Sequence, residues 1–136
     1  MTKMIIIITV FSASIFSALL ADDNSIWAGP TRDNIYTETN LADSWPEDGP
    51  ELLWQFDSLG IGYSAVAVNS SGVYVTGMKS DRTGHLYAFN HDGSIKWTIP
   101  YGSEWHRGFP GTRSTPVIYE GLMYFESAQG VVFCIK

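Results

Sequence analysis

The sequence contains little cysteine and few basic residues. Cys134 is the single cysteine among 136 residues, which excludes a disulfide within the chain and a cysteine-based zinc cluster. Eight lysines and arginines stand against 14 aspartates and glutamates, for a formal net charge of −6. Basic runs are also absent, and nucleic-acid binding depends on neutralising phosphates. We therefore expect no nucleic-acid partner.

The N-terminal segment has the features of a secretory signal peptide. Lys3 precedes an apolar stretch that reaches Leu20, and the small Ala21 is followed by two aspartates. We expect residues 1–21 to be removed and the mature chain to be exported, either to the periplasm or to the extracellular space. An uncleaved membrane anchor is the alternative, because the apolar stretch nearly reaches the length that crosses a bilayer. No later apolar segment reaches that length, so we expect no stable membrane span after cleavage.

Residues 22–51 combine acidic residues with prolines and show no sustained apolar period. Nine acids and one base lie between residues 22 and 57, whereas five acids and six bases follow from residue 58 onward. Prolines are unfavourable within central strands, so the sequence predicts an extended acidic arm. Trp27 and Trp45 indicate that the arm lies on a surface, because large aromatic side chains are seldom left in solvent.

From residue 52 onward, the chain consists of short runs rich in Val, Ile, Tyr, Phe and Trp. These runs are residues 52–56, 64–68, 72–76, 85–89, 95–99, 115–119, 122–125 and 131–135. Runs of four or five such residues are typical of β-strands, and glycine-bearing segments such as 69–72 and 91–93 are typical of hairpin turns. No helical period is present. The sequence therefore predicts an all-β fold of antiparallel strands joined by hairpins.

The strand pattern repeats along the chain. Residues 53–56 recur at 96–99 with an offset of 43, residues 64–68 recur at 114–118 with an offset of 50, and residues 84–90 recur at 130–136 with an offset of 46. A four-stranded unit of this length is typical of the blades of a β-propeller. The sequence predicts a first blade at about 52–99 and an incomplete second blade at about 113–136. A plain β-meander of similar strands is the alternative.

The unit from Ser64 to Trp97 resembles the tryptophan-docking repeat of the pyrroloquinoline quinone (PQQ)-like propellers. In that family a small residue follows Leu-Tyr on the third strand, and a glycine-bearing turn leads to the docking tryptophan. Ala88 and Trp97 match these two places, although the turn between them is one residue shorter than the usual form. Trp54 takes the tryptophan place in the preceding unit, and Cys134 takes the alanine place in the following one.

Packing of blades gives a physical reason for this pattern. Sheets packed face to face need a large flat side chain to fill the space between them, and a small neighbour such as Ala88 leaves room for an indole. Cys134 is expected to serve in the same way as a small buried apolar residue. A reactive thiol is the alternative reading of Cys134.

The longest loop of the repeat region, residues 101–113, contains the candidate ligand-binding residues. These are Trp105, His106, Arg107 and Arg113. Aromatic and cationic groups together suit a planar anionic ligand or a sugar, and loops on rigid β scaffolds often carry function. In the alternative, Trp105 and Phe109 cap a blade, while the arginines pair with Glu104 or with the acidic arm.

Support for catalysis is poor in this sequence. It contains no Cys-Cys pair, no acidic cluster that can be assigned to calcium and no hydrolase or phosphate-binding motif. His85 and His91 are expected to be solvated at opposite ends of one strand. We therefore expect no catalytic, cofactor-binding or metal-binding residues in this chain.

The resemblance implies a secreted or periplasmic scaffold that binds protein partners or further blades without a cofactor. The alternative is the N-terminal part of a PQQ-dependent alcohol or sugar dehydrogenase, whose PQQ and calcium would bind elsewhere. A propeller needs typically four to eight blades, so two blades cannot close a ring. We expect either the front piece of a longer protein or, as the alternative, an assembly of several copies.

Overall fold

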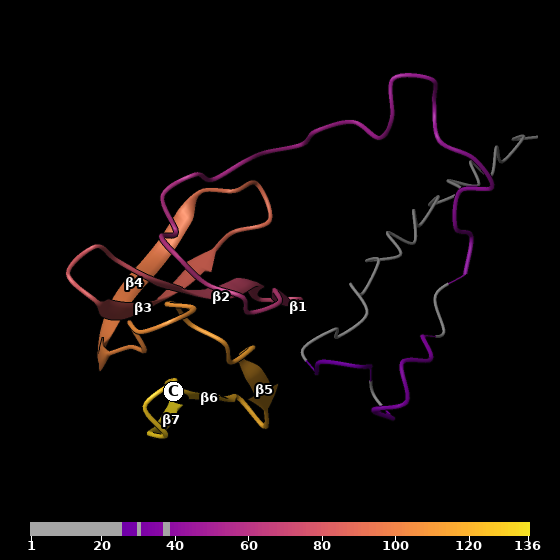
Figure 1. The fold of residues 1–136 in the computed structure, drawn as a ribbon. Helices are drawn as coiled ribbons and strands as arrows, with labels where there is room; N and C mark the ends of the chain where they lie inside the picture. The colour runs from indigo at the N-terminus through magenta and orange to yellow at the C-terminus, as the bar shows by residue number, and fades with distance from the viewer. Residues whose placement is uncertain (1–25, 30, 37–38) are drawn as a thin grey trace, which may run out of the picture.

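The secondary structure of the described residues is entirely β. The computed structural model describes residues 26–29, 31–36 and 39–136, so the predicted signal peptide, residues 1–21, lies outside it (Figure 1). The strands are β1 (Ala67–Asn69), β2 (Gly72–Met78), β3 (Thr83–Phe89), β4 (Ile95–Ser103), β5 (Val117–Tyr119), β6 (Leu122–Glu126) and β7 (Val132–Ile135). The first four form one antiparallel sheet and the last three form a second one. The predicted all-β, antiparallel fold is confirmed.

Polar side chains close the hairpin turns that the sequence predicts. The side-chain oxygen of Asn69 accepts hydrogen bonds from the backbone N–H groups of Ser71 and Gly72, at 2.8 and 3.2 Å. Gly93 has a φ of +84°, a conformation that glycine adopts without the steric cost of a side chain. Its N–H donates to the carbonyl of Asn90 at 3.0 Å. Both turns therefore follow from local residue chemistry.

The structure differs from the predicted strands in several places, three of which have a local explanation. Residues 52–56 form no strand, because none of their backbone groups has a hydrogen-bonding partner among the described residues. The predicted strand 64–68 begins only at Ala67, since the N–H of Ala65 donates to the Thr115 hydroxyl instead of to a neighbouring strand. Strand β4 continues to Ser103, because its pairing with β3 extends to Thr83.

Strand pairing repeats at the offsets that the sequence predicts. Each pair in the first hairpin has a counterpart 50 positions later, and the Ala88 position of β3 has its counterpart 46 positions later, at Cys134. The corresponding pairs are Ala67–Tyr74 with Val117–Tyr124, Tyr74–Ala88 with Tyr124–Cys134, and Thr76–Leu86 with Glu126–Val132. The repeated sequence pattern is therefore also a repeated pattern of pairing, although neither sheet is closed.

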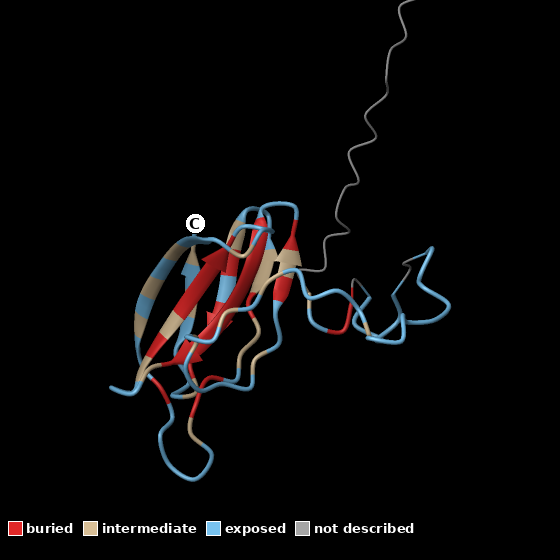
Figure 2. Cartoon of the chain, turned by 90° about the horizontal axis from the view of Figure 1, so that it is seen from above, coloured by how far each residue is buried: buried red, intermediate tan, exposed pale blue. Residues whose placement is uncertain are grey.

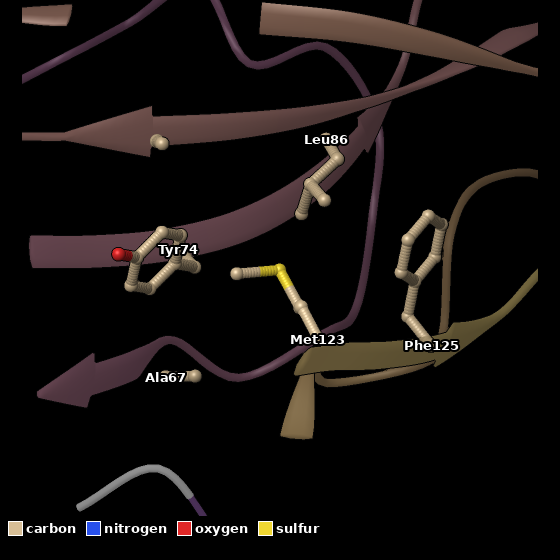
Figure 3. Close-up of a cluster of buried hydrophobic side chains, with 6 residues drawn as sticks. Ala67, Tyr74, Leu86, Met123 and Phe125 are labelled. Carbon is tan, nitrogen blue, oxygen red and sulfur yellow. The ribbon is translucent and has the colours of Figure 1, made fainter. Parts of the chain in front are cut away.

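One hydrophobic cluster joins the two sheets. Tyr74, Leu86 and Ala88 from the first sheet meet Met123 and Phe125 from the second (Figure 3). Leu86 and Ala88 are both fully buried there. Trp97, paired directly with Ala88 across the strands, packs against the same cluster with its ring centroid 6.1 Å from that of Tyr74.

A second cluster covers the opposite face of the first sheet. Val73, Val75, Tyr87 and Phe89 form it, and Trp54, Phe56 and Leu59 pack onto it from the preceding segment. The indole N–H of Trp54 donates to the carbonyl of His91 at 3.0 Å, and a Cβ added to Gly93 would touch the indole ring. Trp54 is therefore seated on the β3–β4 turn, where glycine leaves room for it.

The described residues between 26 and 51 remain largely exposed, as Figure 2 shows beside the buried central strands. Trp27 is 66% exposed and Trp45 is 69% exposed, so neither indole is buried, although Trp27 lines a hollow together with Ala65 and Thr115. The turn from Ile26 to Gly29 is closed by its own backbone hydrogen bond, in which the Gly29 N–H donates to the Ile26 carbonyl at 3.1 Å. No helix in the described residues is long and apolar enough to cross a membrane.

Candidate functional site

The loop between β4 and β5 begins with a buried carboxylate. Glu104 has no exposed surface. Its two side-chain oxygens accept hydrogen bonds from the Tyr101 hydroxyl at 2.6 Å, the Ala128 N–H at 2.8 Å and the Trp105 N–H at 3.3 Å. Because Ala128 belongs to the β6–β7 turn, Glu104 ties the loop and the first sheet to the second sheet.

This arrangement corrects the alternative reading of the loop. That alternative pairs Arg107 and Arg113 with Glu104 or with the acidic arm, but in the described part of the chain no arginine side chain donates to the Glu104 carboxylate. Three donors already occupy the carboxylate, two of them backbone groups that no sequence pattern identifies. The same alternative has Trp105 and Phe109 cap the end of a blade. This is wrong for Phe109, because its side chain is 76% exposed; Trp105 is 40% exposed.

The four predicted ligand-binding residues do not form one cluster. Trp105, His106 and Arg107 lie on the exposed part of the loop, where the Nδ1 atom of His106 lies 3.4 Å from the Glu104 carbonyl. Arg113 lies at the end of the loop, and its Nη2 donates to the Phe109 carbonyl at 2.7 Å. That bond fixes Arg113 within the loop, apart from the other three.

Arg113 faces an aromatic side chain that sequence reasoning missed. Its guanidinium carbon lies 5.5 Å from the centre of the Tyr63 ring, within the range of a cation–π interaction. Tyr63 is held there because its N–H donates to the Thr112 carbonyl at 2.8 Å. Tyr63 lies 50 positions before Arg113, so only the spatial pairing of the two segments brings these residues together.

Two adjoining hollows share Arg113. The first, of about 390 Å³, is lined by Trp27, Tyr63, Ala65, Arg113 and Thr115, and we call it the Arg113 hollow. The second, of about 490 Å³, is lined by Arg113, Ser114, Glu126, Ser127, Ala128 and Gly130. The Arg113 hollow combines one cation with two aromatic rings and the hydroxyls of Tyr63 and Thr115. This chemistry suits a planar anion better than a neutral apolar ligand.

Tyr101 makes the stability of the fold depend on pH in alkaline solution. Burial raises the pKa of its hydroxyl above the ordinary value of 10.0, and the hydrogen bond to Glu104 raises it further. Above about pH 10 the unfolded chain loses this proton while the folded chain keeps it, so stability falls as pH rises. We expect the free energy of unfolding to decline less steeply between neutral pH and about pH 11 in Tyr101→Phe than in the wild type.

Urea titrations at each pH test this expectation. The variant also loses one hydrogen bond at neutral pH, so each protein is compared with its own value at pH 7. Burial raises the pKa of Tyr74 as well, so part of the decline remains in both proteins. Parallel curves for the two proteins would show that Tyr101 does not couple folding to pH.

The docking residues occupy three different environments. Trp54 and Trp97 each pack beside a hydrophobic cluster, and Ala88 is fully buried opposite Trp97. Cys134 occupies the Ala88 position of the second sheet but is exposed, so the expectation of a buried cysteine is wrong for the described chain. The physical reason is that the second sheet covers Ala88, whereas no described segment covers the same face at Cys134.

The remaining candidates form no shared metal site in the described residues. The Nδ1 atom of His85 lies 3.1 Å from the Thr83 carbonyl, and His91 belongs to the β3–β4 turn. No group of three or more His, Cys, Asp or Glu side chains lies together within residues 26–29, 31–36 and 39–136.

Comparison of the sequence with protein-family models gives no match, and comparison with curated proteins gives none either.

Proposed function

We propose that this chain is an exported repeat module of the PQQ-like propeller type that acts as a non-catalytic binding scaffold. The observation that carries the binding role is the fixed Arg113 guanidinium, stacked on Tyr63 at the edge of a hollow. The proposal involves no cofactor. It places the ligand contact on the strand ends and loops, with the two sheets as a rigid support.

The repeated pairing supports the scaffold part of the proposal. Two sheets with corresponding registers pack face to face, and each tryptophan of the repeat lies beside a hydrophobic cluster. A small residue, Ala88, stands opposite Trp97, as the resemblance implies. A packed stack of sheets is stiff, because protein interiors are close-packed and transmit strain instead of absorbing it.

The chemistry of the Arg113 hollow supports the choice of ligand class. Within the described residues the Arg113 guanidinium donates to the Phe109 carbonyl, and it carries further N–H donors that a carboxylate can use. Tyr63 is 59% exposed and Trp27 is 66% exposed, so both rings are accessible for stacking. A planar carboxylate with an aromatic body can satisfy both features at once. We therefore assign aromatic carboxylates to this hollow, either as free molecules or as the C-terminal aromatic residue of a partner protein.

A titration with 2-naphthoate tests the proposal. We expect the wild type to bind this probe with NMR shifts at Tyr63 and Trp27, and Arg113→Gln to weaken binding by about tenfold or more, because a charge-assisted hydrogen bond is lost. Arg107→Gln is the matched control, since it removes an exposed arginine of the same loop that does not line the Arg113 hollow. Equal losses in both variants, or no binding to the wild type, would overturn the proposal.

A further inference from the structure

The two sheets expose corresponding faces to different extents. On the first sheet, Tyr74, Leu86 and Ala88 face the second sheet and are buried. At the same register positions of the second sheet, Tyr124 is 36% exposed, Val132 is 71% exposed and Cys134 is also exposed. We call these three residues the bare face. The second sheet therefore has an uncovered face built on the same register as a covered one, and the exposed Glu126, paired with Val132, lies on this face as well.

Trp54 packs on the first sheet in the way that Trp97 of β4 packs beside the second sheet. The ring centroid of Trp54 lies 5.8 Å from that of Phe89. Trp97, 43 positions after Trp54, lines a hollow of about 390 Å³ together with Ile135, which is the counterpart of Phe89. The two tryptophan-bearing segments differ in their pairing. β4 is hydrogen-bonded to β3, whereas residues 52–56 have no described strand beside them.

Four strands, β1, β4, β5 and β7, lie at the edges of the two sheets in the described part of the chain. The outer edge of β7 is open, although the outer edge of its counterpart β3 is paired with β4. β7 carries no charged residue and no proline, whereas β4 carries Lys96 and Pro100, and β1 and β5 have three residues each. Charges, prolines and short length are the usual protections of edge strands, so β7 is the unprotected edge.

We propose that a second copy of this chain supplies the missing strand. Residues 52–56 of one copy pair antiparallel with β7 of the next copy, in the register that β4 adopts on β3. Trp54 then lies opposite Cys134, and Phe56 lies opposite Val132, as Trp97 and Ile99 lie opposite Ala88 and Leu86. The cluster that carries Trp54 covers the bare face of the neighbouring copy.

This contact joins two different surfaces and is therefore heterologous. Such contacts continue from copy to copy until they close a ring or form an open chain, so assemblies larger than two copies are expected. The Arg113 hollow takes no part, so this inference does not rest on the proposed function.

Sedimentation of the mature chain, residues 22–136, at increasing concentration tests the inference. We expect masses above two copies, together with a decrease of roughly tenfold or more in the reactivity of the Cys134 thiol toward a thiol reagent. Val132→Lys is expected to abolish both changes, because it adds a charge to the edge at an exposed position. Ile95→Lys, a half-exposed position on β4, is the matched control and should assemble like the wild type.

Each other outcome counts against the inference. A monomer whose thiol reacts equally at every concentration would mean that no second copy covers this edge. A dimer that does not grow further would indicate that β7 pairs with itself. Equal loss of assembly in Val132→Lys and Ile95→Lys would indicate non-specific association. Circular dichroism of both variants establishes that they are folded before they are compared.

Discussion

Replacement of Glu104 by alanine is expected to lower the free energy of unfolding by about 2–6 kcal/mol. The Tyr101 hydroxyl and the Ala128 N–H both donate to this carboxylate at less than 3 Å, and the residue that accepts them is fully buried. In the variant both donors lose their partner, and each buried unsatisfied donor costs about 1–3 kcal/mol. Chemical denaturation monitored by tryptophan fluorescence gives the free energy directly.

Glu104→Gln and Tyr101→Phe separate the contributions to this loss. The amide oxygen of glutamine can still accept from the Ala128 N–H, so Glu104→Gln is expected to cost less than Glu104→Ala. Tyr101→Phe removes one donor without leaving the backbone group unpaired, and about 1 kcal/mol is expected. A loss below about 1 kcal/mol in Glu104→Ala would mean that water replaces the carboxylate and that the loop is not anchored by it.

Replacement of Tyr74 by alanine is expected to destabilise the fold by about 3–5 kcal/mol, whereas the same replacement at Tyr124 is expected to cost about 1 kcal/mol or less. The two tyrosines occupy corresponding register positions on β2 and β6. Tyr74 is 6% exposed between the two sheets, but Tyr124 is 36% exposed on the bare face. The difference between the two losses therefore measures burial at a constant residue type and strand position.

Protein concentration is part of the design of this comparison. If copies assemble through the bare face, Tyr124 becomes buried in the assembly and its replacement also weakens association. Denaturation is therefore measured at the lowest concentration that gives a signal, where mass action favours the single chain. Equal losses at the two positions under these conditions would contradict the different burial of the two faces.

The candidate site could be predicted only in part. Arg113 could be chosen from the sequence as a ligand-binding candidate, and it lines both hollows. Its partner Tyr63 could not, because the two residues lie 50 positions apart and share no sequence motif. One alternative from the sequence pairs Glu104 with arginines, because opposite charges attract. The structure instead gives it a hydroxyl and two backbone N–H donors. Backbone donors are present at every position, so their choice depends on which turn lies nearby.

The strands of the repeat were easier to predict than their neighbours. Strands β2 and β3 cover the predicted runs 72–76 and 85–89 and extend beyond them, since both sides of each strand are paired. Residues 52–56 have the same composition but no adjacent strand in the described chain, and they form none. A strand requires a pairing partner as well as suitable residues. Composition shows whether the residues are suitable, but not whether a partner strand lies beside them.

By itself, the sequence determined the class of secondary structure, the positions of the turns and the offsets of 43, 46 and 50 between corresponding residues. These properties depend on local conformational preference and on residue order, and both are set by residues that are close together in the sequence. Tertiary structure alone decided which copy of each repeated residue is buried. Ala88 and Cys134 occupy the same position in equivalent strands, yet only Ala88 is covered. Burial depends on what packs across a face, and for the second sheet no described segment of the single chain does so.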